Sequence, residues 1–289
     1  MKRNLIVGVS VGLGGIEVVL TSPDFEIVER ASRPLPNKIT KEAIATRIEK
    51  AITSLSRCHE AYVVGICLPA TFDKEGKKII SSVFKGLEGV NLYQQIVKKI
   101  SVPIFIFRRS FCSLLAERAF GPAKDVKDAI YVEIGQDIEA AFLVGGKIYR
   151  GASGAAGQIA PMIVDITREK RTSSGDFRAL ISGEGIRALT GKSVYEVLRD
   201  NPKSQLVTQQ ILRDLKESIL TGFYNLKLLF DPELFIVGGD LVENFSLFKS
   251  SFAGLGVKVV KSELGKDAPA LGSAIAAFNS SRKSYDRLY

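Results

Sequence analysis

The sequence predicts an α/β protein with two domains that flank a cleft. The chain has 289 residues, which is enough for about two domains of ordinary size. Apolar runs typical of buried strands alternate with segments of helical spacing, as in α/β folds. A strand, a Gly-rich turn and a second strand occur near residue 12 and again near residue 135. We therefore expect one arrangement built twice, with a site in the cleft between the copies.

The first half of the chain opens on a strand pair. Leu5 to Val9 is an apolar run, Gly12 to Gly15 form a turn, and Ile16 to Leu20 returns with β-branched residues. Helical spacing then appears over 41–55, with apolar residues at 44, 48, 51, 52 and 55. The other elements expected here are strands over 25–30, 61–68 and 104–107, and helices over 91–100 and 110–120.

The second half repeats the opening pattern. Strands are expected over 129–134 and 140–144, and Gly145-Gly146 predicts a tight hairpin turn into a strand over 147–149. Helices are expected over 184–190, 193–199, 205–229 and 270–280, with a buried strand over 234–237. The predicted domains are residues 1–121 and 122–269, and we allow the C-terminal helix 270–289 to pack back on the first domain.

Composition excludes several classes of protein. Hydrophobic residues make up 46% and charged residues 25%, as in globular domains and unlike disordered or collagen-like chains. No run reaches the 18 or so apolar residues of a membrane helix. Residues 1–4 lead directly into a strand, so we expect no signal peptide and place the protein in the cytoplasm.

The counts of reactive residues narrow the chemistry. His59 is the single histidine, and the sequence around it predicts a surface position rather than a triad or a zinc ligand. Cys58, Cys67 and Cys112 form no Cys-x-x-Cys pair, and isolated cysteines in apolar surroundings indicate a reducing compartment. The formal charge is +9, but basic and acidic residues are interspersed, so we expect no nucleic-acid partner and no membrane partner.

Four segments, in order along the chain, resemble the ROK family of sugar kinases and sugar-responsive repressors. The most specific is the run over 145–159, which resembles the family signature Asp-Gly-Lys-Leu-x-x-Gly-x-x-Gly-x-Ala-Gly-Glu-Ile-Gly-His. The others are Leu115-Ala116-Glu117 with Gly121, the strand 231–239, and Ala270 to Ala274. The resemblance implies two RNase H-like domains of the actin-like ATPase type, an ATP-dependent sugar kinase reaction, and a homodimer.

A kinase of this family needs two turns that cradle phosphates, and both are altered here. The resemblance implies that the first turn reads Asp-x-Gly-Gly-Thr. This chain has Ser10 in place of the Asp that helps to hold magnesium and Gly14 in place of the Thr, and it keeps Gly12. The second reads Gly-Thr-Gly-x-Gly, but here it is Gly135 to Glu139, with carboxylates at Asp137 and Glu139. Carboxylates repel a triphosphate. Gly238 and Gly239 keep the adenosine side recognisable.

The catalytic base is the most damaging departure. In the family it lies in an Asn-Asp pair seven residues before the Ala-Glu, a register that falls on Arg108 and Arg109. Arginine stays protonated and cannot accept the proton of a sugar hydroxyl. Neither Asp nor Glu occurs between Gly89 and Glu117, so a small shift of register restores no carboxylate.

The sugar and zinc positions are altered as well. The signature Glu is Gln158 and the signature His is Pro161, and the sugar-binding Glu of the zinc loop falls on Arg178. The cysteine positions of that loop hold Glu169, Arg171 and Asp176, a set that carries no thiolate ligand. We expect no zinc, no other metal and no catalytic residue at the family positions. ATP and Mg²⁺ are cofactors only if the chain is an active kinase.

Three hypotheses follow. The first is a catalytically impaired ROK pseudokinase with a ligand-binding or regulatory role. The second is an active glucokinase or N-acetylhexosamine kinase with a rearranged site, in which Asp137 or Glu139 replaces the base. The third is a DNA-binding regulator, which the sequence disfavours because the first phosphate-turn strand begins near residue 4 and leaves no room for an N-terminal winged helix.

Charge complementarity suggests one more feature of the site. Arg108 and Arg109 lie on one predicted wall, and Asp137 and Glu139 lie on the facing turn. We therefore expect an Arg–carboxylate pair across the former substrate site, or else an anionic small-molecule ligand bound by the arginines.

Overall fold

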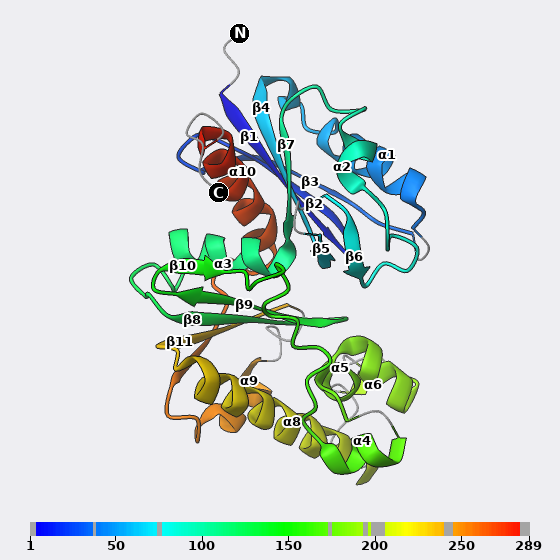
Figure 1. Cartoon of the computed structure of the whole chain (residues 1–289), viewed down its shortest axis with the longest axis vertical. Helices are drawn as coiled ribbons and strands as arrows, with labels where there is room; N and C mark the ends of the chain where they lie inside the picture. Colours follow the sequence, from blue (N-terminus) through cyan, green and yellow to red (C-terminus); the bar gives the residue numbers. More distant parts are fainter. Residues whose placement is uncertain are drawn as a thin grey trace. The chain divides into compact units, whose positions relative to one another are not determined.

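The computed structural model describes residues 4–36, 39–73, 77–172, 175–192, 196–197, 206–239 and 245–283. They form two five-stranded sheets with helices, which confirms the α/β class (Figure 1). The chain divides into two compact units. The first contains residues 1–125, 148–156 and 263–289, and the second contains residues 126–147 and 157–262.

The sheet of the first unit has the strand order β3-β2-β1-β4-β7. Strands β1, β2 and β3 run antiparallel, whereas β4 and β7 are added in parallel. The ranges are β1 Leu5–Gly12, β2 Gly15–Thr21, β3 Ile27–Arg33, β4 Ala61–Leu68 and β7 Ile104–Arg108. All eight residues of β1 are buried, as expected for a central strand covered on both faces.

Helices cover both faces of this sheet. Helix α1 (Lys41–Ile52) and helix α2 (Leu92–Ile96) contribute to one apolar core, and α10 (Ala268–Lys283) packs on the other face with α3 (Arg109–Phe120). The C-terminal helix therefore belongs to the first unit over its described residues, and residues 284–289 of the predicted helix lie outside them. A small two-stranded sheet, β5 (Ala70–Phe72) with β6 (Ile79–Ser82), follows β4.

Helix α10 approaches the sheet very closely, and glycines make this possible. A Cβ atom on Gly65 of β4 would lie 1.9 Å from the carbonyl oxygen of Ser273, and one on Gly8 of β1 would lie 2.0 Å from that of Ala270. The Ser273 hydroxyl accepts a hydrogen bond from the N–H of Val9 at 3.0 Å. It donates to a backbone carbonyl, and the nearest one is that of Ala270, at 2.8 Å. The helix is thus fixed to β1 by a buried polar contact as well as by apolar packing.

A buried carboxylate anchors the chain at the start of α10. Glu117 of α3 is fully buried, and its side chain accepts the backbone N–H groups of Glu263 at 3.4 Å and Leu264 at 3.1 Å. Charge-assisted bonds to backbone donors compensate for the burial of a carboxylate. Glu117, the acidic residue of the Leu115-Ala116-Glu117 segment, therefore has a structural role in this chain.

The sheet of the second unit has the order β10-β9-β8-β11-β12, which matches the order of the first sheet element by element. The duplication predicted from the two Gly-containing turns is therefore confirmed. The strands are β8 Ala129–Ile134, β9 Ile138–Val144, β10 Lys147–Tyr149, β11 Leu234–Gly238 and β12 Lys258–Lys261. The helices of this unit include α4 Ile166–Thr172, α5 Phe177–Ile181, α6 Gly183–Thr190, α8 Leu206–Phe230 and α9 Phe245–Phe248.

Some predicted elements were wrong in extent. The helix expected over 91–100 ends at Ile96, and the third strand begins at Ile27 because Phe25 adopts a positive φ of 65° in the preceding turn. The pair β5–β6, helices α4, α5 and α9, and strand β12 were not predicted, because each is too short for a clear periodic pattern. Most of the helix predicted over 193–199 lies outside the described residues.

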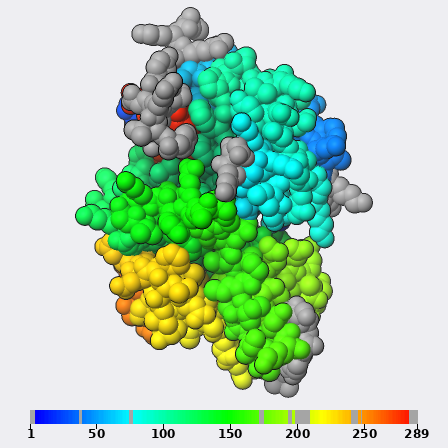
Figure 2. All heavy atoms as spheres, viewed as in Figure 1, coloured from blue at the N-terminus to red at the C-terminus, as the bar shows by residue number. Residues whose placement is uncertain are grey.

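Among the described residues, no helix is both long enough and apolar enough to cross a bilayer. Helix α8 has 25 residues, yet its sequence alternates apolar with charged and amide side chains. Residues coloured yellow, which include the C-terminal part of α8, form part of the molecular surface (Figure 2).

Candidate functional site

The first phosphate-turn segment forms the β1–β2 hairpin of the first unit. Gly12 ends β1 opposite Gly15 of β2, and Leu13 and Gly14 make the two-residue turn between them. Ser10, at the position expected for a magnesium-side carboxylate, is 3% exposed within β1. Its hydroxyl brings no negative charge to the hairpin, so the residues present do not fit a magnesium ion held in the family's manner.

Arg108 and Arg109 lie where the register predicted, at the junction of β7 and α3. Arg108 is the last residue of β7 and the N-cap of α3, and Arg109 is the first residue of that helix. The first turn of α3 contains no acidic residue. Cations at the positive end of a helix dipole cost about 0.3–1 kcal/mol each. Two of them at one N-terminus break a local rule of helix design, as functional sites often do.

The Arg108 side chain closes onto the signature loop of its own unit. The residue is 3% exposed, and its Nη1 donates to the carbonyl oxygens of Ala156 and Gly154. Its guanidinium also lies over the Phe111 ring, 4.6 Å from the centroid, a cation–π contact. Arg108 lies at the Asn position of the family's Asn-Asp pair, and its side chain is committed to protein groups.

Arg109 lies against the first phosphate turn. A Cβ atom on Gly12 would be 3.3 Å from Nη1 of Arg109 and 3.6 Å from its Cζ. The position implied to hold the catalytic carboxylate therefore holds a guanidinium, which packs on the hairpin. A protonated guanidinium attracts anions but accepts no proton.

The second phosphate-turn segment connects β8 and β9 in the second unit. Gly135 N–H donates to the carbonyl of Asp137 at 2.9 Å, so this donor is used within the turn. The carbonyls of Gly135 and Gln136 accept the N–H groups of Gly183 and Glu184 at 2.7 and 3.2 Å. The N-terminus of α6 is thereby hydrogen-bonded to the turn, and none of these three N–H groups is directed at a ligand.

Asp137 forms a bidentate salt bridge with Arg178 of α5. Nε of Arg178 donates to Oδ1 of Asp137 at 2.7 Å, and Nη2 donates to Oδ2 at 3.2 Å. Burial alone would lower the pKa of Arg178, but the hydrogen bonds and the charge of Asp137 outweigh it and raise that pKa. Arg178 stands at the position where the family resemblance implies a sugar-binding Glu, so the salt bridge links that position to the second phosphate turn. Both residues belong to the second unit.

Glu133 is a residue of the site that was not predicted from the sequence. This residue lies in β8, is 6% exposed, and is paired directly opposite Glu139 of β9. Side chains opposite each other in an antiparallel pair share a face of the sheet, with Cβ atoms about 4.5–5.5 Å apart. Glu133, Asp137 and Glu139 therefore bring three carboxylates to the β8–β9 hairpin, and Asp137 is the one that pairs with Arg178. The one sequence indication was a carboxylate inside an otherwise apolar strand.

Gly238 and Gly239 are required by packing. A Cβ atom on Gly238 would lie 1.8 Å from the Tyr131 hydroxyl, and one on Gly239 would lie 2.5 Å from the carbonyl oxygen of Ile134. Gly239 also has a φ of 82°, which favours glycine. These two residues are retained where β11 passes β8, whatever they contribute to nucleotide binding.

The positions of the family's zinc loop are used for backbone capping. The Glu169 carboxylate accepts the N–H of Gly175 at 2.8 Å, and the Asp176 carboxylate caps α5 by accepting the N–H of Ala179 at 2.7 Å. Within the described residues no three His, Cys, Asp or Glu side chains gather in a way that could hold a metal ion. Gln158 is exposed between β10 and α4. These residues do not fit the family's zinc site.

The arrangement supports binding more readily than proton transfer. Arg108 and Arg109 belong to the first unit, and Asp137 and Glu139 belong to the second, so pairing between the two sets stays a prediction. What the structure does bring together is Asp137 with Arg178, and Arg109 with Gly12. Each contact places a guanidinium at a position where the family resemblance implies a carboxylate.

Comparison with known proteins gives one consistent result. The ROK family profile matches residues 6–279. The xylose repressor of Bacillus subtilis (strain 168) is 26% identical, over 94% of this chain and 76% of that protein. The glucokinase of Thermotoga maritima is 22% identical, over 95% of this chain and 97% of that protein.

A solved structure shows the same fold. The ROK family glucokinase of Streptomyces griseus, crystallised with glucose and AMPPNP, superposes with a TM-score of 0.81 at 19% identity. It covers 95% of this chain and 99% of that one. Because the family profile spans nearly the whole sequence and the fold agrees, the chain belongs to the ROK family.

Proposed function

We propose that this ROK protein is a pseudokinase: it is sugar-kinase-like in fold, is impaired in phosphoryl transfer, and keeps a ligand-binding or regulatory role. The observation that carries the proposal is Arg109. It lies at the start of α3, where the family resemblance implies the base, and its guanidinium contacts Gly12 of the first phosphate turn. General base catalysis needs a group that accepts a proton near neutral pH, which arginine does not do.

The phosphate turns support the same conclusion. Phosphoryl transfer depends on charge stabilisation of the transferred group by metal ions and backbone donors. Ser10 supplies no charge for a magnesium ion, and the β8–β9 hairpin presents carboxylates where a triphosphate would need N–H groups. Both departures weaken binding of the nucleotide as well as catalysis.

A regulatory role is supported by the kind of proteins that this chain resembles. The B. subtilis relative is a xylose repressor. The two arginines at the start of α3 favour an anionic small-molecule ligand near the former substrate site. We place the protein in the cytoplasm, because its three cysteines are free thiols of the kind that persist in a reducing compartment, and we propose no nucleic-acid partner.

The second candidate is an active sugar kinase with a rearranged site. It requires Asp137 or Glu139 to act as the base, and ATP with Mg²⁺ as cofactors. Asp137 is disfavoured because both of its carboxylate oxygens are held by Arg178. Glu139 lies directly opposite another carboxylate in the hairpin, so neither residue is placed as a lone base beside a substrate.

Magnesium-dependent ATP binding distinguishes the two candidates. We expect isothermal titration of the full chain with ATP and MgCl₂ to give no binding tighter than millimolar, because the charge and the N–H donors for the phosphates are lost. The same titration with a ROK glucokinase serves as the positive control. Micromolar affinity that disappears on adding a chelator of magnesium would favour the active kinase.

We also propose that the protein forms a homodimer through α8. Four large apolar side chains of this helix are strongly exposed, namely Leu220, Tyr224, Leu228 and Leu229, at 38%, 46%, 65% and 74%. Three of them recur every four residues, so they share one face of the helix. A contiguous apolar face of this kind typically marks a protein–protein interface.

Light scattering after size exclusion tests the dimer. The wild-type chain is expected at twice the monomer mass of 31.5 kDa, and Leu228→Glu with Leu229→Glu is expected to convert it to a monomer. Leu189→Glu, a change at an exposed leucine of α6, is the matched control and should remain dimeric. A wild-type protein that is monomeric at about 50 µM, far above the micromolar Kd of weak complexes, would contradict this proposal.

A further inference from the structure

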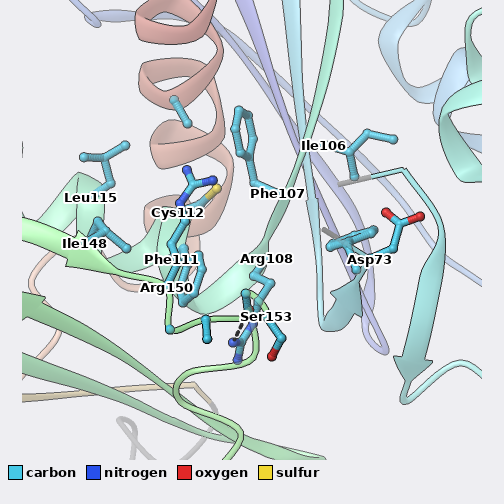
Figure 3. A pocket seen from close by; sticks show the side chains of 15 residues that line it. Asp73, Ile106, Phe107, Arg108, Phe111, Cys112, Leu115, Ile148, Arg150 and Ser153 are labelled. Carbon is cyan, nitrogen blue, oxygen red and sulfur yellow. Dashed lines mark hydrogen bonds between the residues drawn. The ribbon is translucent and has the colours of Figure 1, made fainter. Parts of the chain in front are cut away.

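The first unit contains a cavity of about 350 Å³ beside Arg108, one of the two arginines at the junction of β7 and α3. It lies at the end of β7, between α3, the segment 148–154 and Ala276 of α10 (Figure 3). All of its lining residues belong to the first unit. This volume is at the lower end of the range of pockets that bind small molecules.

The walls of the cavity are mainly apolar. Its apolar lining side chains include Phe72, Phe107, Phe111, Leu115 and Ile148. A hexose presents several hydroxyl groups, and each of them would need a hydrogen-bond partner on burial. The lining side chains offer few acceptors beyond Asp73 and Ser153, so the cavity suits a flat or branched apolar body better than a sugar.

Two arginines give the cavity a positive end. Arg108 is buried, and its contacts with Phe111 and with the carbonyls of Gly154 and Ala156 fix it as part of the wall. Arg150 is exposed, and no described carboxylate forms a salt bridge with it. Figure 3 shows the Arg150 side chain running past Phe111 toward Cys112. Its guanidinium is therefore available to a ligand in the cavity.

The single acidic lining residue, Asp73, lies away from Arg150. In Figure 3 the two side chains are on opposite sides of β7. Burial alone would raise the pKa of Asp73, but the backbone N–H groups of Lys77 and Lys78, at 2.7 and 3.1 Å, lower it, so the carboxylate is ionised at neutral pH. This charge disfavours a second negative group at that end of a ligand.

We infer that this cavity binds a small organic monocarboxylate with an apolar, preferably aromatic, body. The carboxylate pairs with the guanidinium fork of Arg150, a geometry that arginine favours over lysine. The body packs against Phe107 and Phe111, where aromatic stacking adds to apolar burial. This inference rests on the ligand-binding role in the proposed function and names the chemistry of that ligand, but it does not depend on Arg109 or on any residue of the second unit.

Calorimetry on the full chain tests the inference with phenylacetate as the probe. Phenylacetamide is the uncharged analogue of the same shape, and glucose is the sugar control. We expect phenylacetate to bind at least about tenfold more tightly than phenylacetamide, because a hydrogen bond to a charged group contributes about 1.5–3 kcal/mol. Glucose should give no heat of binding at the same concentration.

Variants assign the binding to the cavity. Arg150→Gln removes the charge at an exposed position and is expected to weaken phenylacetate at least about tenfold, while Arg150→Lys should recover part of the loss. Ser153→Trp fills the mouth and should abolish binding of the probe. Arg187→Gln, at an exposed arginine of α6 outside the cavity, is the matched control and should bind normally.

Three results would overturn the inference. They are no detectable binding of phenylacetate, equal binding of phenylacetate and phenylacetamide, or unchanged affinity in both Arg150→Gln and Ser153→Trp. Thermal unfolding of each variant shows that a lost signal does not come from lost structure. The ATP titration proposed above can fail or succeed without affecting any of these outcomes.

Discussion

Gly65→Ala is expected to destabilise the first unit by about 3 kcal/mol, the upper end of the cost of overpacking a core. The new Cβ atom would lie 1.9 Å from the carbonyl oxygen and 2.5 Å from the carbonyl carbon of Ser273, so backbone atoms of α10 would have to move. That movement also disturbs the Ser273 hydroxyl, which accepts the N–H of Val9. A flexible side chain could give way, but a helix fixed to two strands has no such freedom.

Thermal unfolding followed by circular dichroism measures this effect. The midpoint is expected to fall by about 6–12 °C, from the usual 2–4 °C per kcal/mol for a domain of this size. Gly14→Ala is the matched control in the same unit, because a Cβ atom there meets nothing within 4 Å. The Gly14 variant should unfold within about 2 °C of the wild type, since the change affects mainly the unfolded chain. Equal midpoints for Gly65→Ala and the wild type would mean that α10 does not pack on β4 as described.

Much of the fold could be predicted from the sequence because its long elements have strong periodic patterns. The apolar runs of β1 and β4 and the helical spacing of α1 gave elements within a few residues of those observed. The two strand–turn–strand units predicted that one arrangement is built twice, and each sheet does contain such a hairpin, β1–β2 in the first and β8–β9 in the second. Short elements such as β5 and α5 were missed because three to five residues show no distinct period.

The candidate site shows a different limit. The register of the family motifs placed Arg108 and Arg109 at the end of β7 and the start of α3, where the structure has them. Their partners were not predictable from the sequence. Asp137 and Arg178 are separated by 41 positions, and a list of charges does not say which of several arginines a carboxylate meets. The contacts of Arg108 with Gly154 and Ala156 depend on how a loop folds against a strand end, which no local pattern encodes.

Glu133 illustrates why a single residue is easily overlooked. Five of the six residues of β8 are apolar or aromatic, so the sequence predicts a buried core strand, and nothing local distinguishes its one carboxylate. Its importance comes from the cross-strand pairing with Glu139, which requires the register of the hairpin. Register is a property of two strands together, and it sets which side chains share a face.

Sugar phosphorylation tests the central claim of a lost kinase activity most directly. A panel of hexoses and N-acetylhexosamines is incubated with ATP and Mg²⁺, and ADP formation is followed with the S. griseus glucokinase as the positive control. We expect turnover below about 0.1 per second for every sugar, against an ordinary enzyme value near 10 per second. The physical reason is that Arg109 accepts no proton, Ser10 holds no magnesium, and the β8–β9 hairpin repels the phosphates. Turnover above about 0.1 per second with any sugar of the panel, dependent on magnesium and lost when Asp137 or Glu139 is changed to the amide, would contradict the pseudokinase account and establish a rearranged active site.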